Sequence, residues 1–297
     1  MRNLRILGCT VGVALLAGVI GTGTLLAGQK GKPNPNGNRN AQSDADDKSE
    51  GSSGNASCVG LPDQSALELA LDAATMTEAS GLNNQMWATL VDRDGVVCAV
   101  AFSGADRGAQ WPGSRVISAQ KASTANAFSL DSSSSPDNAS GHANGLALST
   151  ANLYSAVQDG GTLFGLQFSN PVDPAVAYKG PSIHYGTAHD PMVGRKIGGV
   201  NVFGGGLGLY ATGKKIIGGV GVSGDTSCSD HYIAWRVRHI LGLDHMVGVG
   251  GVNSDVTRPD NIIFDISGGV SAGGFGHPHC TAGAGDTPTT PLPVVIP

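Results

Sequence analysis

The sequence contains little charge, and positive charge in particular is scarce. Asp, Glu, Lys and Arg make up 14% of the 297 residues, where about 25% is usual in globular domains, and the formal net charge is −5. No stripe of Lys and Arg stands out along the chain. Since nucleic-acid binding depends on such a positive surface, we expect no nucleic acid among the partners.

The sequence also lacks the usual signatures of covalent catalysis. Residues 221–224 read Gly-Val-Ser-Gly, which breaks the G-x-S-x-G pattern of a nucleophile elbow at its end. No paired carboxylates and no Cys/His arrangement suggest an acid–base or thiol mechanism. An enzymatic role is therefore less favoured than ligand binding, although it stays open as an alternative.

A formal dinucleotide fingerprint is present, but its surroundings do not support it. Gly219, Gly221 and Gly224 match G-x-G-x-x-G between a predicted strand and a predicted helix. A bound pyrophosphate needs positive charge at the helix N-terminus, whereas Asp225 and Asp230 stand there. We therefore interpret these glycines as allowing a helix or a flat ligand to approach the strand closely.

The first 57 residues contain the features of export and nothing that could form a core. Arg2 and Arg5 precede an uncharged, mostly apolar run over 6–29. This layout is typical of a secretory signal peptide or, because about 20 apolar residues span a bilayer, of an uncleaved anchor. We expect an exported protein, periplasmic or secreted, that contacts a membrane only through residues 1–28.

One domain is expected after this segment. Residues 29–57 hold no apolar side chain other than Ala, which predicts a disordered linker. The residues from 281 onward are rich in Pro and Thr, which predicts a disordered tail over 281–297. Residues 58–280 remain as a single domain of ordinary size.

Cysteine usage also favours an oxidising compartment. If the N-terminal segment is removed, Cys58, Cys98, Cys228 and Cys280 remain. An even number predicts two disulfides, for which three connectivities are possible. We prefer Cys58–Cys98 and Cys228–Cys280, and the alternative is that some of these residues are buried free thiols.

A cluster of possible metal ligands precedes the last cysteine. Residues 277–280 read His-Pro-His-Cys, but no second His or Cys pair stands at the spacing of a zinc site. A solvated tail held by a disulfide is the favoured interpretation of this stretch.

The pattern of elements predicts an α+β domain. Apolar residues recur at helical spacing from Leu67, behind a capping box of Ser65 and Glu68, and Asp94-Gly95 suits a hairpin turn. Helices mixed with hairpins favour a mainly antiparallel sheet with helices packed on it. The predicted helices are 65–80, 114–130 and 229–241, and the predicted strands are 86–91, 96–102, 200–203, 207–211, 215–223 and, as a covering strand, 262–266.

The last predicted helix carries an unusual polar face. His231, Trp235 and His239 recur every four residues, opposite the apolar core face of the same helix. Such a face is equally consistent with a contact surface for a subunit or ligand and with a half-buried face under a loop.

Three stretches together resemble the GlcG/HbpS family of haem-binding proteins, which is related to the C-terminal domain of PduO. Residues 88–95 (ATLVDRDG) resemble its VVD-x-x-G hairpin, and residues 119–125 (AQKASTA) resemble its A-x-K-A-x-T-A helix. Residues 215–224 (KIIGGVGVSG), followed by Asp230, resemble its strand motif. The resemblance spans about residues 61–243.

The resemblance implies a profilin-like antiparallel sheet of about five strands with packed helices, and frequent homo-oligomers. It implies haem or a related flat tetrapyrrole as the ligand, with haem storage, sensing or slow degradation in some members. The motif residues that carry over to this sequence are Lys121, Gly219, Gly221, Ser223, Gly224 and Asp230.

The sequence departs from the compact family pattern in three places. His231 stands where the strand motif usually continues with an acid, an insert occupies 131–199, and a C-terminal extension occupies 244–280. Both long segments are expected to reshape or cover the pocket.

These observations lead to one main hypothesis and two alternatives. The main one is an exported haem-binding protein for haem capture, storage or sensing, in which Lys121 pairs with a propionate and His184 or His189 ligates the iron. The first alternative is an enzyme acting on a small organic acid or aromatic through Lys121, Asp230 and His231. The second is a structural, oligomer-forming envelope protein.

Overall fold

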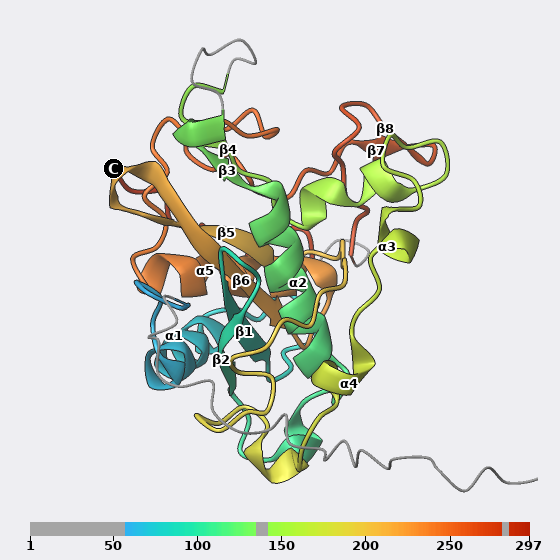
Figure 1. Ribbon diagram of the computed structural model, residues 1–297. Coiled ribbons are helices and arrows are strands. Elements are labelled where there is room, and N and C mark those ends of the chain that lie inside the picture. The colour runs from blue at the N-terminus through green and yellow to red at the C-terminus, as the bar shows by residue number, and fades with distance from the viewer. Residues whose placement is uncertain (1–56, 135–141, 281–284) are drawn as a thin grey trace, which may run out of the picture. The chain divides into compact units, whose positions relative to one another are not determined.

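The computed structural model describes residues 57–134, 142–280 and 285–297 (Figure 1). The predicted signal peptide or anchor over 1–28, and all but the last residue of the predicted linker over 29–57, lie outside these residues. Within the described part of the chain, no helix is long and apolar enough to cross a bilayer.

The main sheet is antiparallel throughout and has the order β2-β1-β6-β5. It has four strands among the described residues, where about five were expected. Two hairpins, β1–β2 and β5–β6, meet in the middle of the sheet, where Trp87 pairs with Ser223 and Asp92 pairs with Gly218. Its strands are β1 (Trp87–Asp92), β2 (Val97–Phe102), β5 (Gly206–Ala211) and β6 (Lys215–Ser223).

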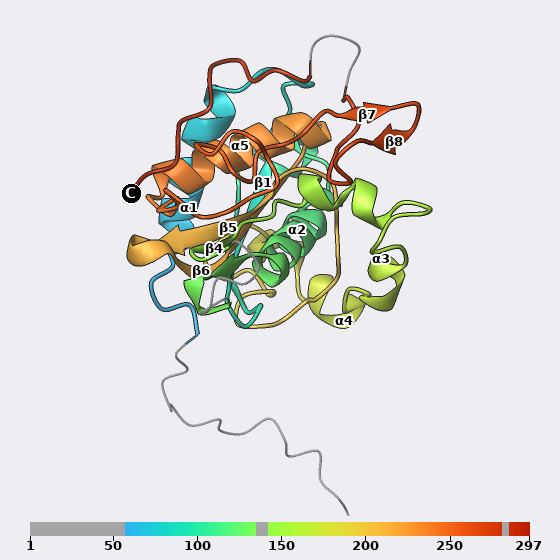
Figure 2. The same ribbon diagram turned by 90° about the horizontal axis from the view of Figure 1, so that it is seen from above.

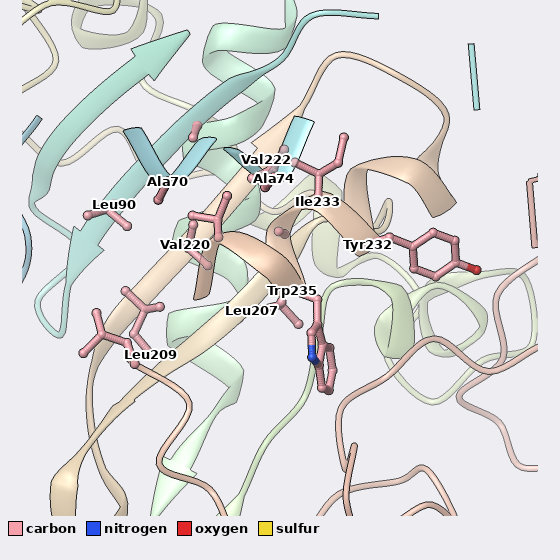
Figure 3. Close-up of a cluster of buried hydrophobic side chains, with 14 of the residues drawn as sticks. Ala70, Ala74, Leu90, Leu207, Leu209, Val220, Val222, Tyr232, Ile233 and Trp235 are labelled. Carbon is pink, nitrogen blue, oxygen red and sulfur yellow. The ribbon is translucent and has the colours of Figure 1, made fainter. Parts of the chain in front are cut away.

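Three main helices cover the two faces of this sheet, which confirms the predicted α+β class. Helices α1 and α5 pack on one face and α2 packs on the other, as Figure 2 shows. The larger core cluster contains Ala70 and Ala74 of α1, Leu90 of β1, Val220 of β6 and Ile233 of α5 (Figure 3). The helices are α1 (Gln64–Met76), α2 (Ser114–Phe128) and α5 (Ser227–Ile240).

Helix α1 shows how closely the pattern determined local structure. Its apolar stripe beginning at Leu67 is buried as expected. The helix begins one residue earlier than predicted because Asp63, not Ser65, is the N-cap, with its carboxylate accepting a hydrogen bond from Ala66 N at 2.9 Å. It ends at Met76, four residues before the predicted end.

Helix α2 lies very close to β6, and two glycines make this possible. A Cβ atom added to Gly221 would lie 1.9 Å from Ser118 O, and one added to Gly219 would lie 2.4 Å from Ala122 O. Backbone oxygen atoms cannot move away as side chains can, so only glycine fits at these positions. The sequence predicted that a helix or a flat ligand packs against these glycines, and in the structure it is helix α2.

Short elements make up the insert and the extension. The predicted strands over 200–203 and 262–266 are not formed as such, since 200–203 is irregular and only Ile266–Ser267 of the second region is paired. The short elements are β3 (Leu130–Asp131), β4 (Gly145–Leu146), α3 (Leu166–Ser169), α4 (Pro174–Ala177), β7 (Ile266–Ser267) and β8 (Val270–Ser271).

The C-terminal extension and residues 285–297 together cover the outer face of α5. Trp235 Nε1 of α5 donates a hydrogen bond to Pro293 O at 3.0 Å, and Leu292 and Val295 are buried. The structure therefore differs from the predicted disordered tail over 281–297, because residues 285–297 belong to the packed domain.

Both preferred disulfides are present. Cys58 is bonded to Cys98, and Cys228 is bonded to Cys280. The first joins the segment before α1 to strand β2, and the second joins the start of α5 to the extension. The two bonds fit an oxidising compartment.

Candidate functional site

Lys121, the proposed propionate partner, is buried inside the domain. Only 1% of the residue is exposed, and its Nζ lies 2.6 Å from Asp230 Oδ2 and 3.0 Å from Val222 O. Burial lowers the pKa of Lys121, and the nearby Asp230 carboxylate opposes this. The structure therefore corrects the proposed role, since a ligand carboxylate cannot reach an ammonium already enclosed and paired.

Asp230 connects this ion pair to the end of strand β6. Its Oδ1 accepts hydrogen bonds from Gly224 N at 3.1 Å and from Asp225 N at 2.8 Å. Burial raises the pKa of Asp230 to about 6, while Lys121 acts in the opposite direction. Ser223 is buried next to this turn. The family-motif residues thus meet around one buried ion pair and hold α2, β6 and α5 together.

The polar face of α5 is buried, not a contact surface. His231 and Trp235 are fully buried, and only His239 is partly exposed, where its Nδ1 lies 2.8 Å from Asp244 Oδ2. The extension covers this face, whereas the sequence suggested a loop of the insert or an external partner. His231 is therefore not available to a small-molecule substrate.

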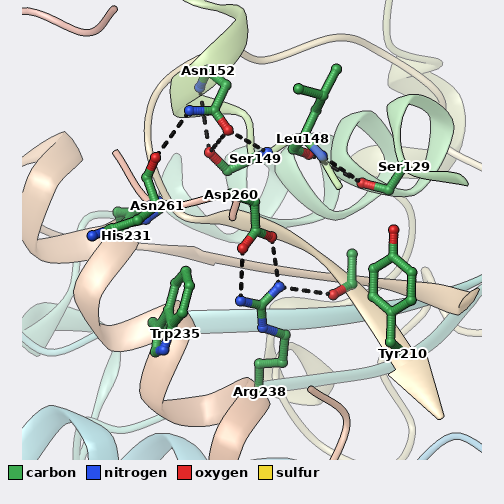
Figure 4. Close-up of polar contacts among 12 residues, drawn as sticks. Ser129, Leu148, Ser149, Asn152, Tyr210, His231, Trp235, Arg238, Asp260 and Asn261 are labelled. Carbon is green, nitrogen blue, oxygen red and sulfur yellow. Dashed lines mark hydrogen bonds and ion pairs between the residues drawn. The ribbon is translucent and has the colours of Figure 1, made fainter. Parts of the chain in front are cut away.

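A buried ion pair attaches the extension to α5, as Figure 4 shows. Arg238 donates to both carboxylate oxygens of Asp260, at 2.6 and 3.0 Å, and both side chains are fully buried. Next to it, His231 Nε2 accepts a hydrogen bond from Ile262 N at 3.2 Å. Asn152 of the insert donates to Asn261 O at 3.1 Å, so the insert, the extension and α5 share this network.

The buried histidines predict a loss of stability at low pH. Burial lowers the pKa of His231 to about 3 and that of His277 to about 4. In the unfolded chain a histidine titrates at about 6.5, so below that pH the unfolded state binds protons that the folded state does not. The free energy of unfolding is therefore expected to fall as the pH drops from about 6.5 toward 4, and to receive no contribution from these groups above 6.5.

Urea unfolding between about pH 4.5 and 7 measures this slope, and His231→Gln should flatten it. Asp230 acts in the opposite sense, since its raised pKa lets the folded state take up a proton first. Comparing wild type with His231→Gln cancels that contribution. Equal slopes in the two proteins would contradict the assignment of a neutral, buried His231.

His184 and His189, the proposed iron ligands, lie together on the surface. Both are exposed, and their ring centroids are 6.2 Å apart in a T-shaped arrangement. Ile183, beside them, has 79% of its surface exposed. Two imidazoles and an apolar side chain therefore face solvent on one short segment.

A buried ion pair holds this segment in place. Arg115 of α2 makes a two-fold ion pair with Asp190, and its guanidinium lies 3.6 Å from the ring centre of Tyr185. Asp190 also accepts hydrogen bonds from Gly186 N and Met192 N, at 2.8 and 2.9 Å. These contacts hold the segment in one conformation. Arg115 and Asp190 were not identified from the sequence, because 75 positions separate them.

A groove of about 560 Å³ lies elsewhere, beside the second half of α2. Phe128, Leu166 and Val200 contribute apolar walls, Arg93 and Lys196 contribute positive charge, and Asp94 contributes one negative charge. Arg93 is fixed by hydrogen bonds from its Nη1 to the backbone and side-chain oxygens of Asn126. The lining contains no imidazole, thiol or phenol that could ligate iron. The groove is suited to a small organic anion that has an apolar body.

The predicted site residues therefore form two separate groups. The motif residues Lys121, Gly219, Gly221 and Asp230 form a buried structural centre. His184 and His189 are exposed on the insert, whereas Lys121 is enclosed, so the three side chains cannot contact one ligand together.

A family model described as "Haem degrading protein HbpS-like" matches residues 61–238. No curated protein matches the chain. Similar solved structures include protein ORFY of Klebsiella pneumoniae, of the DUF336 family model, at 21% identity and a TM-score of 0.38, covering 61% of this chain and 90% of that one.

Two further solved structures are similar to parts of the chain. PduOC in a complex with haem is 20% identical, with a TM-score of 0.38, over 59% of this chain and 89% of that one. HbpS is 12% identical, with a TM-score of 0.33, over 60% of this chain and 86% of that one.

Proposed function

The chain belongs to the HbpS-like family, and we propose that it binds haem outside the cytoplasm, for haem capture, storage or sensing. The family description supports haem as the ligand. The two disulfides support an exported location, since such bonds persist in oxidising compartments. We place the binding site at His184 and His189 because these two neighbouring imidazoles are exposed. The ion pair of Arg115 with Asp190 holds their loop in place.

In this proposal one of these imidazoles is the axial ligand of the haem iron. Neutral imidazole is a common axial ligand, and an exposed ring needs no rearrangement to reach an iron atom. The exposed Ile183 gives the porphyrin an apolar neighbour. In this proposal Arg107, and not Lys121, pairs with a haem propionate. The guanidinium of Arg107 lies 5.8 Å from the ring centre of Tyr185, which belongs to the loop of the two histidines.

The test is a haemin titration of the purified full-length chain, followed by visible absorption. Wild type is expected to give a saturable, shifted Soret band at about one haem per chain. His184→Ala/His189→Ala should lose this band because it removes both candidate ligands. The single variants show which of the two imidazoles ligates the iron.

His239→Ala is the matched control, since it removes another partly exposed histidine from a different element. It should keep the band of wild type. An unchanged spectrum in the double variant would overturn the ligand assignment. Absence of a shifted band in wild type would overturn haem binding itself.

The groove beside α2 favours a second candidate function, the binding of a small organic acid. Arg93 and Lys196 outnumber Asp94 in the lining of this groove, and Phe128 and Leu166 give it apolar walls. Carboxylates of small aromatic or aliphatic acids match this lining. Thermal unfolding with a panel of such acids tests it, because a true ligand should raise the Tm of wild type and not of Arg93→Ala/Lys196→Ala.

A further inference from the structure

Three potential metal ligands meet at the start of helix α5, away from the residues proposed for haem. Ligand atoms of Cys228, His277 and Cys280 all lie within 4.8 Å of one another. Cys228 and His277 are buried and Cys280 is partly buried. Thiolate sulfur and imidazole nitrogen are the donors that Zn²⁺ and related divalent cations prefer. In this structure the two sulfur atoms are joined in a disulfide.

The ring of His277 is already oriented for coordination. Its Nδ1 lies 2.7 Å from Pro278 O, and because a carbonyl only accepts, Nδ1 must carry the hydrogen. Nε2 therefore holds the free lone pair, which accepts the hydroxyl hydrogen of Ser227 at 2.7 Å. Metal-binding histidines are usually oriented by such a hydrogen bond at the other ring nitrogen.

A carboxylate stands beside the three ligands. Asp286 Oδ1 lies 4.0 Å from Cys228 Sγ and accepts a hydrogen bond from Cys280 N at 3.0 Å. Its other oxygen lies 2.6 Å from His279 Nδ1. A tetrahedral site needs four donors, and Asp286, which contacts Cys228 and Cys280, is available as the fourth.

The N-terminus of α5 lies beside both cysteines. Cys228 is the second residue of α5, where the helix dipole favours negative charge. Its backbone N–H donates to Cys280 Sγ at 3.0 Å. The two Cα atoms are 6.1 Å apart, so rotation of the side chains can bring the sulfur atoms to the separation of about 3.8 Å that two zinc-bound thiolates adopt.

The other disulfide lacks these features and serves as an internal comparison. Cys58 and Cys98 have a carboxylate nearby, that of Asp92, but no imidazole. Asp92, like Asp286, accepts hydrogen bonds from neighbouring N–H groups, so the missing imidazole is what distinguishes this group from the first. This group is therefore a structural crosslink.

We propose that Cys228, Cys280, His277 and Asp286 form a redox-gated site for a zinc-class divalent cation. A dithiol reductant supplies two electrons and two protons, the S–S bond breaks, two thiols form, and the reductant becomes a disulfide. The cation then displaces the two thiol protons into solvent. A disulfide oxidant accepts two electrons from the thiolates and two protons from solvent and becomes a dithiol, while the S–S bond of the protein forms again and the cation is released.

Cobalt(II) titration of the full-length chain, without haem, tests the proposal. In the presence of a metal-free phosphine reductant, we expect a sulfur-to-cobalt charge-transfer band that saturates at one ion per chain and is lost when Zn²⁺ is added. The oxidised chain should show no such band. His277→Ala keeps both cysteines and the disulfide, so it folds in the oxidised form; after reduction its Co²⁺ affinity should fall at least tenfold, as after loss of any zinc ligand.

Cys58→Ser/Cys98→Ser is the matched control and should keep the band, whereas Cys228→Ser should lose it. Zn²⁺ should also raise the Tm of the reduced wild type and leave that of the oxidised protein unchanged. A reduced wild type without the band, or a band that persists in Cys228→Ser, would overturn the site. Equal affinities of wild type and His277→Ala would remove the histidine from it.

Discussion

Replacing Lys121 with Met is expected to lower the free energy of unfolding by about 3–5 kcal/mol. The substitution leaves the Asp230 carboxylate buried without the ammonium that lies 2.6 Å from it. An unpaired buried charge is far more costly than the pair it came from. Urea unfolding monitored by fluorescence measures the change, because the transition midpoint should fall while its slope stays constant.

The variant Lys121→Met/Asp230→Asn separates the ion pair from other effects. Asn removes the second charge and keeps an oxygen atom for the N–H groups of Gly224 and Asp225. The double variant should regain at least half of the lost stability. At a temperature where Lys121→Met is folded, its haem affinity should equal that of wild type; a tenfold loss would restore the propionate role that its burial argues against.

Replacing Gly221 with Ala is expected to destabilise the protein by about 3 kcal/mol or more. The new methyl group would lie 1.9 Å from Ser118 O, so α2 must move away from β6. This motion also stretches the contact between Lys121 and Asp230, which lies at the same interface. Thermal and urea unfolding both report the change.

Gly113→Ala is the matched control for this prediction. Gly113 precedes α2, has a φ of −66°, and would place a Cβ atom in open space. Its stability should stay within about 0.5 kcal/mol of wild type. If Gly221→Ala were as mild as this control, the close approach of helix and strand would not be the reason for glycine in the motif.

The elements with strong local signals were predictable from the sequence. The β1–β2 hairpin follows from two β-rich runs around Asp94-Gly95, and α2 and α5 lie within one or two residues of their predicted ends. Both disulfides also matched the preferred pairing. These features depend on short stretches of chain or on a small number of alternatives.

The parts that failed depend on contacts between distant residues. Lys121 in an Ala-rich helix looks solvated until Asp230, 109 positions away, is placed beside it. Leu292 and Val295 stand among prolines, so no periodic pattern revealed that they are buried. The same is true of Arg115 and Asp190, whose pairing fixes the loop of His184 and His189.

The residues that cover α5 are synthesised after the helix, so this part of the domain cannot finish folding until they have been made. Trp235 obtains its hydrogen-bond acceptor from Pro293, and Arg238 obtains its carboxylate from Asp260. Both partners leave the ribosome after the helix they cover. Until these partners have been synthesised, Trp235 and Arg238 stay exposed on the nascent chain. A chain that stops short of residue 260 lacks both partners and is therefore expected to be retained by chaperones and degraded, although it contains the whole family-matched region.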